Sequence, residues 1–120
     1  MIAFLPRFFR RFRKSEPAWI ECDELQRRLA SGRVTLIDVR QPEEYSAQPG
    51  HLPGALNVPL ADVGGRSADL AARKAPIVIV CKTDRRSAKA ATELLAAGLS
   101  DVSVLRGGTD AWHRQGLPLE

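Results

Sequence analysis

Cysteine is scarce in this chain, since its 120 residues include only Cys22 and Cys81. The two form no CxxC pair, and together with His51 and His113 they show no spacing typical of a metal site. We therefore predict no metal and no other cofactor. A domain of this length can build a core without a disulfide, so we expect free thiols, a reducing compartment and a cytoplasmic location.

Long hydrophobic runs are also missing, although 44% of the residues are hydrophobic and 27% are charged, as is ordinary for a globular protein. No stretch approaches the ~20 apolar residues of a membrane-spanning helix. The start, "MIAFLPRFFRRFRK", lacks the order of a secretory signal, in which charge precedes an apolar run. The length predicts one domain, which we place at residues 17–120, preceded by a tail at residues 1–16.

Negative charge is almost absent from this tail. Residues 1–16 hold five basic side chains against Glu16, which accounts for the net charge of +4. Residues 17–120 hold 13 basic and 13 acidic side chains, so the domain itself is neutral. The basic character therefore describes the tail, and we predict no nucleic-acid partner for the domain.

The tail has the pattern of an amphipathic helix. At ~100° per residue, Ile2, Leu5 and the four phenylalanines fall in one arc, with the five cations opposite. This pattern is typical of a helix that lies in a membrane interface, with arginine facing anionic headgroups. We predict peripheral membrane contact or partner contact through residues 1–14. A disordered basic tail, an early start site and an organelle transit peptide are the alternatives that the sequence leaves open.

Short β-rich runs alternate with helical patterns in the domain. Helices are predicted at residues 22–32, 87–98 and 109–116, with Thr109 as the N-cap of the last. Because β and α units alternate, we predict an α/β fold with three α/β/α layers around an open, mainly parallel sheet of about five strands. Strands are predicted at Val34–Val39, Ala55–Leu60, Ile77–Val80 and Val102–Leu105.

Cys81 ends one of these strands and precedes a loop that leads into a helix. Ligands bind at this edge of open α/β sheets, and the backbone N–H groups at a helix start favour anions. Lys82, Arg85 and Arg86 follow within five residues. A reactive cysteine benefits from such positive charge because the nucleophile is the thiolate. A structural cysteine that merely completes a core strand is the alternative, and the three cations argue against it.

The chain resembles a single-domain rhodanese over nearly all of residues 18–120. Four segments carry this resemblance in the order found in that family. A single segment such as "DVR" would be weak support, whereas four in order are specific. The segments are "LIDVRQPEEY", "GHLPGALNVPL", "IVIVCKTDRRSAKAATELLAAG" and "VLRGGTDAWHRQGLPL".

The resemblance implies that Cys81 takes a sulfane sulfur from an anionic donor such as thiosulfate and passes it to a thiophilic acceptor, cyanide or a thiol. It implies a substrate-binding loop after Cys81, which Asp38 and Arg40 support from below. For Asp38 and Arg40, an ordinary surface ion pair is the alternative. Asp84 departs from the family pattern, where glycine is common. Aspartate tolerates left-handed backbone geometry better than most residues, so the loop can still form, but its carboxylate would oppose activation of the thiolate unless it pairs with Arg85 or Arg86 or caps the helix. The donor preference therefore stays open. The loop residues are Lys82, Thr83, Asp84, Arg85, Arg86 and Ser87.

Two other functions are compatible with this fold. A phosphatase or arsenate reductase of the same fold places an arginine six residues after its cysteine, whereas here Arg86 is five residues after Cys81. A non-catalytic interaction module is the other alternative, although such modules often lack the cysteine. The sequence leaves open whether the protein is a monomer or a homodimer, and fold alone does not decide function.

Overall fold

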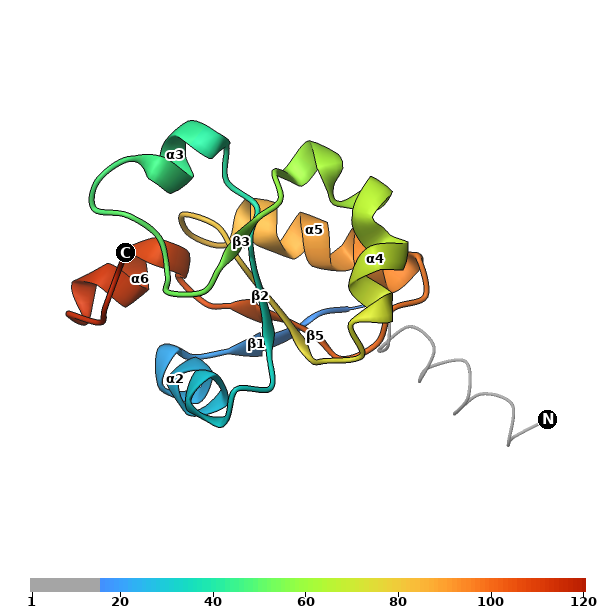
Figure 1. Cartoon of the computed structure of the whole chain (residues 1–120), viewed down its shortest axis with the longest axis horizontal. Coiled ribbons are helices and arrows are strands. Elements are labelled where there is room, and N and C mark those ends of the chain that lie inside the picture. Colours follow the sequence, from blue (N-terminus) through green and yellow to red (C-terminus); the bar gives the residue numbers. More distant parts are fainter. Residues whose placement is uncertain (1–15) are drawn as a thin grey trace.

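A computed structural model describes residues 16–120 of the chain. The predictions about the tail at residues 1–14 lie outside these residues. The fold is a five-stranded sheet in the order β1-β5-β4-β2-β3, in which every neighbouring pair is parallel (Figure 1). The predicted α/β class and the parallel sheet are confirmed. The strands are β1 (Ala18–Ile20), β2 (Thr35–Asp38), β3 (Leu56–Asn57), β4 (Ile77–Val80) and β5 (Val102–Leu105).

Helices cover both faces of the sheet (Figure 1). Helices α4 and α5 pack over one apolar cluster that contains Ile79 and Leu94, while α2 and α6 pack over another that contains Leu25 and Trp112. The central strand β4 is buried along its whole length because both faces are covered. The helices are α2 (Cys22–Ser31), α3 (Pro42–Ser46), α4 (Ser67–Ala72), α5 (Arg85–Ala96) and α6 (Gly108–Arg114), with short 3-10 turns at Leu60–Asp62 and Gly64–Arg66.

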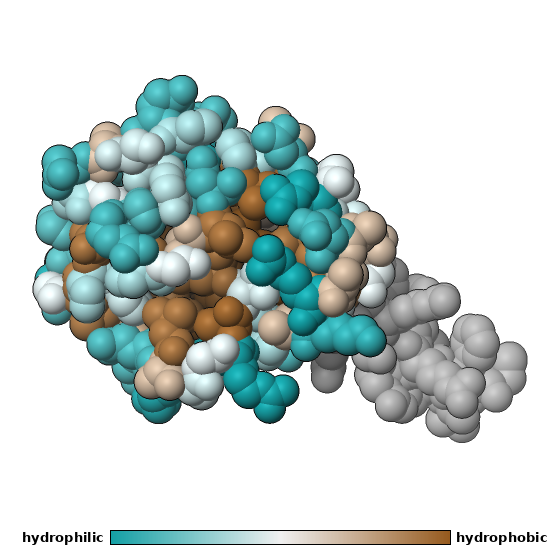
Figure 2. Space-filling view, in the orientation of Figure 1, coloured by the Kyte–Doolittle hydropathy of each residue, from teal (hydrophilic) through white to brown (hydrophobic). Residues whose placement is uncertain are grey.

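The surface in the view of Figure 2 is hydrophilic around its rim and hydrophobic near its centre, over the region of β3. Strand β3 is an edge strand of the sheet, and its two residues are half-buried. Within residues 16–120, no helix is long and apolar enough to cross a membrane.

The strands of the sequence prediction are present, with differences in extent. The strand predicted at Ala55–Leu60 is reduced to β3, because Pro59 cannot donate to a ladder and a 3-10 turn starts at Leu60. Strand β1 is not predicted from the sequence, because its three residues form a strand through their pairing with β5. Helices α3 and α4, which have five and six residues, are not predicted either.

Candidate functional site

The carboxyl ends of three neighbouring strands converge on Cys81. Cys81 follows β4 directly, Asp38 ends β2, and Gly107 lies just beyond β5. Parallel strands bring their carboxyl ends to one edge of the sheet, so chain segments far apart in sequence meet there. This is the edge at which the sequence analysis placed the reactive cysteine.

The Cys81 side chain is buried, with 1% of its surface exposed. Its Sγ lies 3.2 Å from Ser87 Oγ and accepts a hydrogen bond from the Ser87 backbone N–H at 3.3 Å. The Ser87 hydroxyl in turn donates to the Asp84 carbonyl oxygen at 3.1 Å. The sulfur is therefore turned toward the first turn of α5, where N–H groups lack intrahelical acceptors and favour negative charge.

The loop is shorter than the sequence suggests, because α5 begins at Arg85 instead of after Arg86. Asp84 precedes this helix with φ −131°, so the loop forms without left-handed geometry at this position. Its carboxylate neither caps α5 nor pairs with Arg85 or Arg86. Asp84 Oδ1 instead accepts a hydrogen bond of 2.7 Å from the backbone N–H of Gly107.

Further backbone hydrogen bonds fasten this loop to the start of α6. Thr109 N–H donates to the Cys81 carbonyl at 2.8 Å, and Asp110 N–H donates to the Lys82 carbonyl at 3.1 Å. Gly108 lies between these contacts with φ +58°, and a Cβ there would overlap both carbonyl groups. Helix α6 begins at Gly108, with Gly107 as the preceding N-cap residue, and not after Thr109 as predicted.

Arg86 makes a two-pronged ion pair with Glu44 of α3. Its Nη1 lies 2.6 Å from Oε1 and its Nη2 lies 3.0 Å from Oε2. The hydrogen bonds from Arg86 lower the pKa of Glu44 to about 2, and the carboxylate raises the pKa of Arg86 in return. Glu44 Oε1 also accepts a hydrogen bond of 3.0 Å from the Gln41 N–H at the start of α3. One carboxylate thus joins α3 to the first turn of α5.

The other two cations of the loop differ in their surroundings. Lys82 Nζ lies 2.8 Å from Asp110 Oδ2 on α6, and both side chains are exposed. Arg85 is exposed and has no carboxylate partner among the described residues. Thr83 is also exposed, at the tip of the loop. Two of the three charges that the sequence places beside Cys81 are therefore balanced by carboxylates from distant segments.

Asp38 and Arg40 form a buried pair, so the alternative of an ordinary surface ion pair is wrong. Asp38 is fully buried and Arg40 is 6% exposed. Arg40 Nε and Nη2 both bind the Asp38 carboxylate, and Nη2 also donates to the Gly50 carbonyl at 3.1 Å. The guanidinium is thus fixed in place. Its Nη1 has no hydrogen-bond partner within residues 16–120, and because no buried side-chain nitrogen there lacks a partner, Nη1 is accessible to solvent.

A cavity of about 200 Å³ lies beside this pair and the loop. It extends between α3, the turn that contains the cis Gln48–Pro49 bond, and α6. Charges of both signs surround it, together with two apolar side chains. The cationic or titratable residues are Arg40, Lys82 and His113, the carboxylates are Glu44 and Asp110, and the apolar residues are Pro49 and Leu119.

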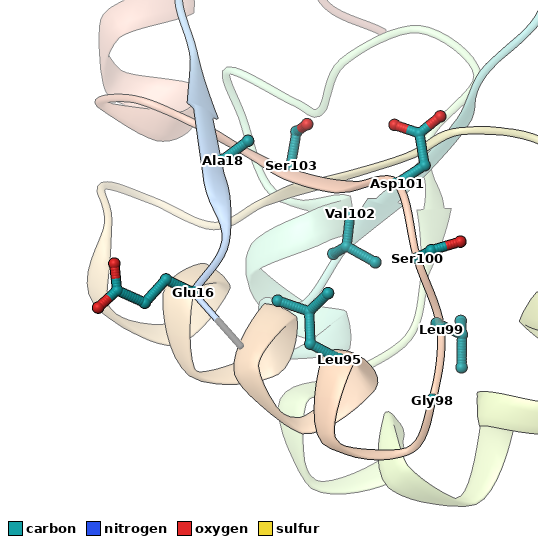
Figure 3. A pocket seen from close by; sticks show the side chains of 9 residues that line it. All are labelled: Glu16, Ala18, Leu95, Gly98, Leu99, Ser100, Asp101, Val102 and Ser103. Carbon is teal, nitrogen blue, oxygen red and sulfur yellow. The ribbon is translucent and has the colours of Figure 1, made fainter. Parts of the chain in front are cut away.

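Larger hollows lie at the opposite edge of the sheet. One of about 500 Å³ is formed where α5 ends and β5 begins, and Figure 3 shows its lining residues. It carries the carboxylates of Glu16 and Asp101 but no cysteine, histidine or cation. A second, of about 480 Å³, shares four of the same residues. Neither contains a cysteine or a histidine that could activate its serines, so the candidate chemistry of the described residues centres on Cys81.

Two other residues of reactive types, Cys22 and His51, make contacts that suit a structural role. Cys22 is a free thiol in the apolar cluster under α2, and burial raises its pKa. His51 stacks on Tyr45 with ring centroids 3.6 Å apart, and its Nδ1 lies 2.9 Å from the Tyr45 carbonyl oxygen. No group of three or more metal-binding side chains occurs in residues 16–120.

The carboxylates that pair with the loop cations, Glu44 and Asp110, are not evident from the sequence. Glu44 is 42 residues from Arg86, and Asp110 is 28 residues from Lys82. No local pattern links residues at such separations. The glutamate three residues after Gln41 does follow the spacing of a helix-start motif, and this signal could have placed Glu44 at the beginning of a helix.

Comparison with known proteins agrees with this geometry. Residues 21–115 match the Rhodanese-like domain family. A sulfurtransferase of Allochromatium vinosum is 36% identical over 101 residues, which cover 83% of this chain and 92% of that protein. The HTH-type transcriptional regulator Rv0324 of Mycobacterium tuberculosis is 39% identical over 98 residues, and this chain spans 42% of its length.

Among solved structures, the human single-domain sulfurtransferase TSTD1 is similar with a TM-score of 0.69 and 29% sequence identity. The match covers 82% of this chain and 96% of that one. The similarity thus extends over most of the described domain, and the family match at residues 21–115 includes the strand, loop and helix that hold Cys81.

Proposed function

The chain belongs to the rhodanese-like domain family, and we propose that it is a sulfurtransferase that carries a sulfane sulfur as a persulfide on Cys81. The observation that carries this proposal is the position of Sγ. The sulfur sits at the carboxyl edge of the sheet, hydrogen-bonded by Ser87 N–H and directed at the first turn of α5. These N–H donors favour negative charge, which suits the anionic outer sulfur of a persulfide.

In the first step, the Cys81 thiolate attacks the outer sulfur of a donor such as thiosulfate. A bond forms between Sγ and that sulfur, the donor's S–S bond breaks, and sulfite leaves with the electron pair. The new persulfide anion extends toward the N-terminus of α5, where the Ser87 N–H already donates to sulfur at this position. No oxidant is needed, because the transferred sulfur already has the oxidation level of a persulfide.

In the second step, a thiophilic acceptor attacks the outer sulfur of the persulfide. With cyanide, a carbon–sulfur bond forms, the S–S bond of the persulfide breaks, and thiocyanate leaves while Cys81 returns to the thiolate. A thiol acceptor reacts in the same manner and becomes a persulfide itself. The donor and acceptor are then the partners of the protein.

Arg40 and Arg85 are the cations best placed to attract a charged donor. Arg40 is fixed by Asp38 and lines the cavity beside the loop, with Nη1 free to donate. Arg85 is exposed at the start of α5. Arg86, in contrast, uses both terminal nitrogens on Glu44, so its role in this proposal is to hold the helix start.

The same contact argues against a phosphatase. Phosphatases of this fold need an arginine that encircles a tetrahedral anion beside the cysteine. Here the arginine of the loop is one residue closer to Cys81 and is bound to Glu44. A purely non-catalytic module gives no reason for a sulfur that accepts a backbone hydrogen bond at a helix start.

Intact-mass spectrometry tests the proposal directly. Incubation of the full chain with thiosulfate, or with the persulfide of cysteine, should add the mass of one sulfur to Cys81. Cyanide should then remove that mass and release thiocyanate. A protein that gains no sulfur from either donor would contradict the proposal.

A further inference from the structure

The charges beside Cys81 balance, although the loop sequence is basic. Lys82, Arg85, Arg86 and Arg40 are opposed by the same number of carboxylates. These are Asp110 on Lys82, Glu44 on Arg86 and Asp38 on Arg40, while Asp84 lies in the loop itself. The formal charge of these eight side chains is therefore zero at neutral pH, before the Cys81 thiolate is counted.

This balance matters for the first chemical step. Thiosulfate carries two negative charges and must approach a thiolate, so its reaction needs uncompensated positive charge nearby. An organic persulfide reacts with the thiolate in its protonated form, R–S–SH, in which the reacting sulfur carries no charge, and even its anion carries one charge fewer at the reacting group than thiosulfate. The Cys81 thiolate attacks that outer sulfur, the S–S bond breaks, and the R–S thiolate leaves with the electron pair. This reaction therefore needs less positive charge near the thiolate than the reaction with thiosulfate.

The cavity beside the loop has the character of a site for an organic group. Its volume of about 200 Å³ is below the ~300–1,000 Å³ of drug-sized pockets, so it suits a molecule of amino-acid size. Cationic Arg40 can receive a carboxylate, and Glu44 can receive an ammonium group. Pro49 and Leu119 offer apolar contact for a short aliphatic stem.

We propose that Glu44 and Asp110 are specificity-determining residues, which make Cys81 select a small zwitterionic persulfide, such as that of an amino-acid thiol, over dianionic thiosulfate. This rests on the proposed function and adds the class of donor. Glu44 acts by neutralising Arg86 and Asp110 by neutralising Lys82. Both carboxylates also border the cavity that would hold the donor's body.

The test is the half-reaction without acceptor. The rate of sulfur addition to Cys81 is followed by rapid quenching and intact-mass spectrometry, with thiosulfate and with the persulfide of cysteine as donors. Wild-type protein should react faster with the persulfide. Glu44→Gln and Asp110→Asn should each accelerate loading from thiosulfate about tenfold, as expected for one charge removed near a dianion. Neither change should accelerate loading from the persulfide.

Added salt separates this electrostatic role from a structural one. In the two variants, thiosulfate loading should fall as ionic strength rises, because a net positive site then attracts a dianion. Asp69→Asn is the matched control, since it removes a carboxylate from the exposed Arg66–Asp69 pair near α4, away from the loop and the cavity. It changes the net charge equally and should leave both rates unchanged.

Asp110→Asn keeps the test meaningful if Glu44→Gln lowers stability, because Asp110 is an exposed side chain. The proposal is overturned if wild-type protein prefers thiosulfate, or if the ratio of the two loading rates is the same in wild type and Asp110→Asn. In both cases Cys81 still gains a sulfur and the proposed function stands. Failure of both donors to load Cys81 would remove the proposed function and this inference together.

Discussion

The two cysteines of this chain are almost equally buried, and each lies near a helix start, yet the charged and polar groups around them differ. Cys22 is 3% exposed and Cys81 is 1% exposed. Cys22 opens α2 between Glu21 and Asp23, and burial together with these charges raises the pKa of its thiol. Cys81 precedes α5 and accepts a hydrogen bond from Ser87. Burial alone therefore says little about a thiol, and the direction of the sulfur and its neighbours define its chemistry.

Replacement of the nucleophile should have the largest effect. Cys81→Ser should abolish sulfur loading and thiocyanate formation, because a serine hydroxyl is not ionised at neutral pH and oxygen cannot form the persulfide. Far-ultraviolet circular dichroism should be unchanged, since the smaller oxygen keeps the neighbours of Sγ. Cys22→Ala is the matched control and should retain the wild-type rate. Thiocyanate production by Cys81→Ser at the wild-type rate would remove the distinction between the two cysteines.

Gly108→Ala should come next, because it disturbs the surroundings of Cys81 and leaves those of Cys22 intact. The added Cβ would overlap the carbonyl groups of Cys81 and Lys82, at a backbone angle of +58° that disfavours alanine. We expect a loss of roughly 2–4 kcal/mol in the free energy of unfolding and a large loss of sulfur loading. Urea denaturation measures the first effect. Gly32→Ala, at φ +75° with no atom near its Cβ, is the control for the backbone angle alone.

Alkylation compares the two thiols directly. At neutral pH, iodoacetamide should modify Cys81 at least about tenfold faster than Cys22, since thiolate character governs this reaction more strongly than a small difference in exposure. Peptide mapping by mass spectrometry at increasing reaction times gives both rates in one sample. Equal rates, or a faster Cys22, would show that exposure decides and would contradict the comparison.

Ser87→Ala should have a smaller effect. It removes the hydroxyl 3.2 Å from Sγ but keeps the backbone N–H that donates to the sulfur at 3.3 Å. In the structure the hydroxyl accepts from the Cys81 thiol and donates to the Asp84 carbonyl, so it has to turn toward Sγ to donate to the thiolate. Loss of that one hydrogen bond corresponds to ~0.5–1.5 kcal/mol, or about 2- to 13-fold in the rate of sulfur loading. An effect as large as that of Cys81→Ser would instead assign the hydroxyl an essential role.

The smallest effect concerns stability at low pH. The pKa of Glu44 is lowered from 4.5 to about 2 by Arg86, so this pair stabilises the fold fully above pH 4.5. That contribution is lost as the pH falls from 4.5 toward 2. Because both side chains are about one-third exposed, solvent screens the pair and we expect roughly 1 kcal/mol. Urea denaturation should show that the free energy of unfolding falls less between pH 6 and pH 3 in Glu44→Gln than in wild type.

Much of the fold could be predicted from the sequence because many of its strands and helices show local hydrophobic patterns. The buried run at Ile77–Val80 and the helical spacing after Ser87 identify β4 and α5, and their junction locates Cys81. Elements whose stability comes from distant partners were missed. Strand β1 exists by pairing with β5, and its three residues carry no pattern of their own.

The candidate site divides in the same way. The sequence shows the thiol and the cations because they are neighbours in the chain. It does not show that Arg86 is bound to Glu44, or that Asp84 turns away from the arginines toward Gly107. These contacts depend on how α3, α5 and the β5–α6 turn are brought together by the sheet. Charge near a cysteine can be counted from sequence, but its compensation can only be seen in three dimensions.

The attachment of the loop to the start of α6 has a consequence for protein engineering. The conformation of residues 81–87 is determined jointly with residues 107–110, through the Asp84–Gly107 contact and the backbone hydrogen bonds to Cys81 and Lys82. A loop graft that moves residues 81–87 alone onto a related scaffold would lack the contacts that residues 107–110 make with this loop. The transplantable unit is therefore a pair of segments about 20 residues apart, and designs that exchange both together should retain the geometry of the sulfur.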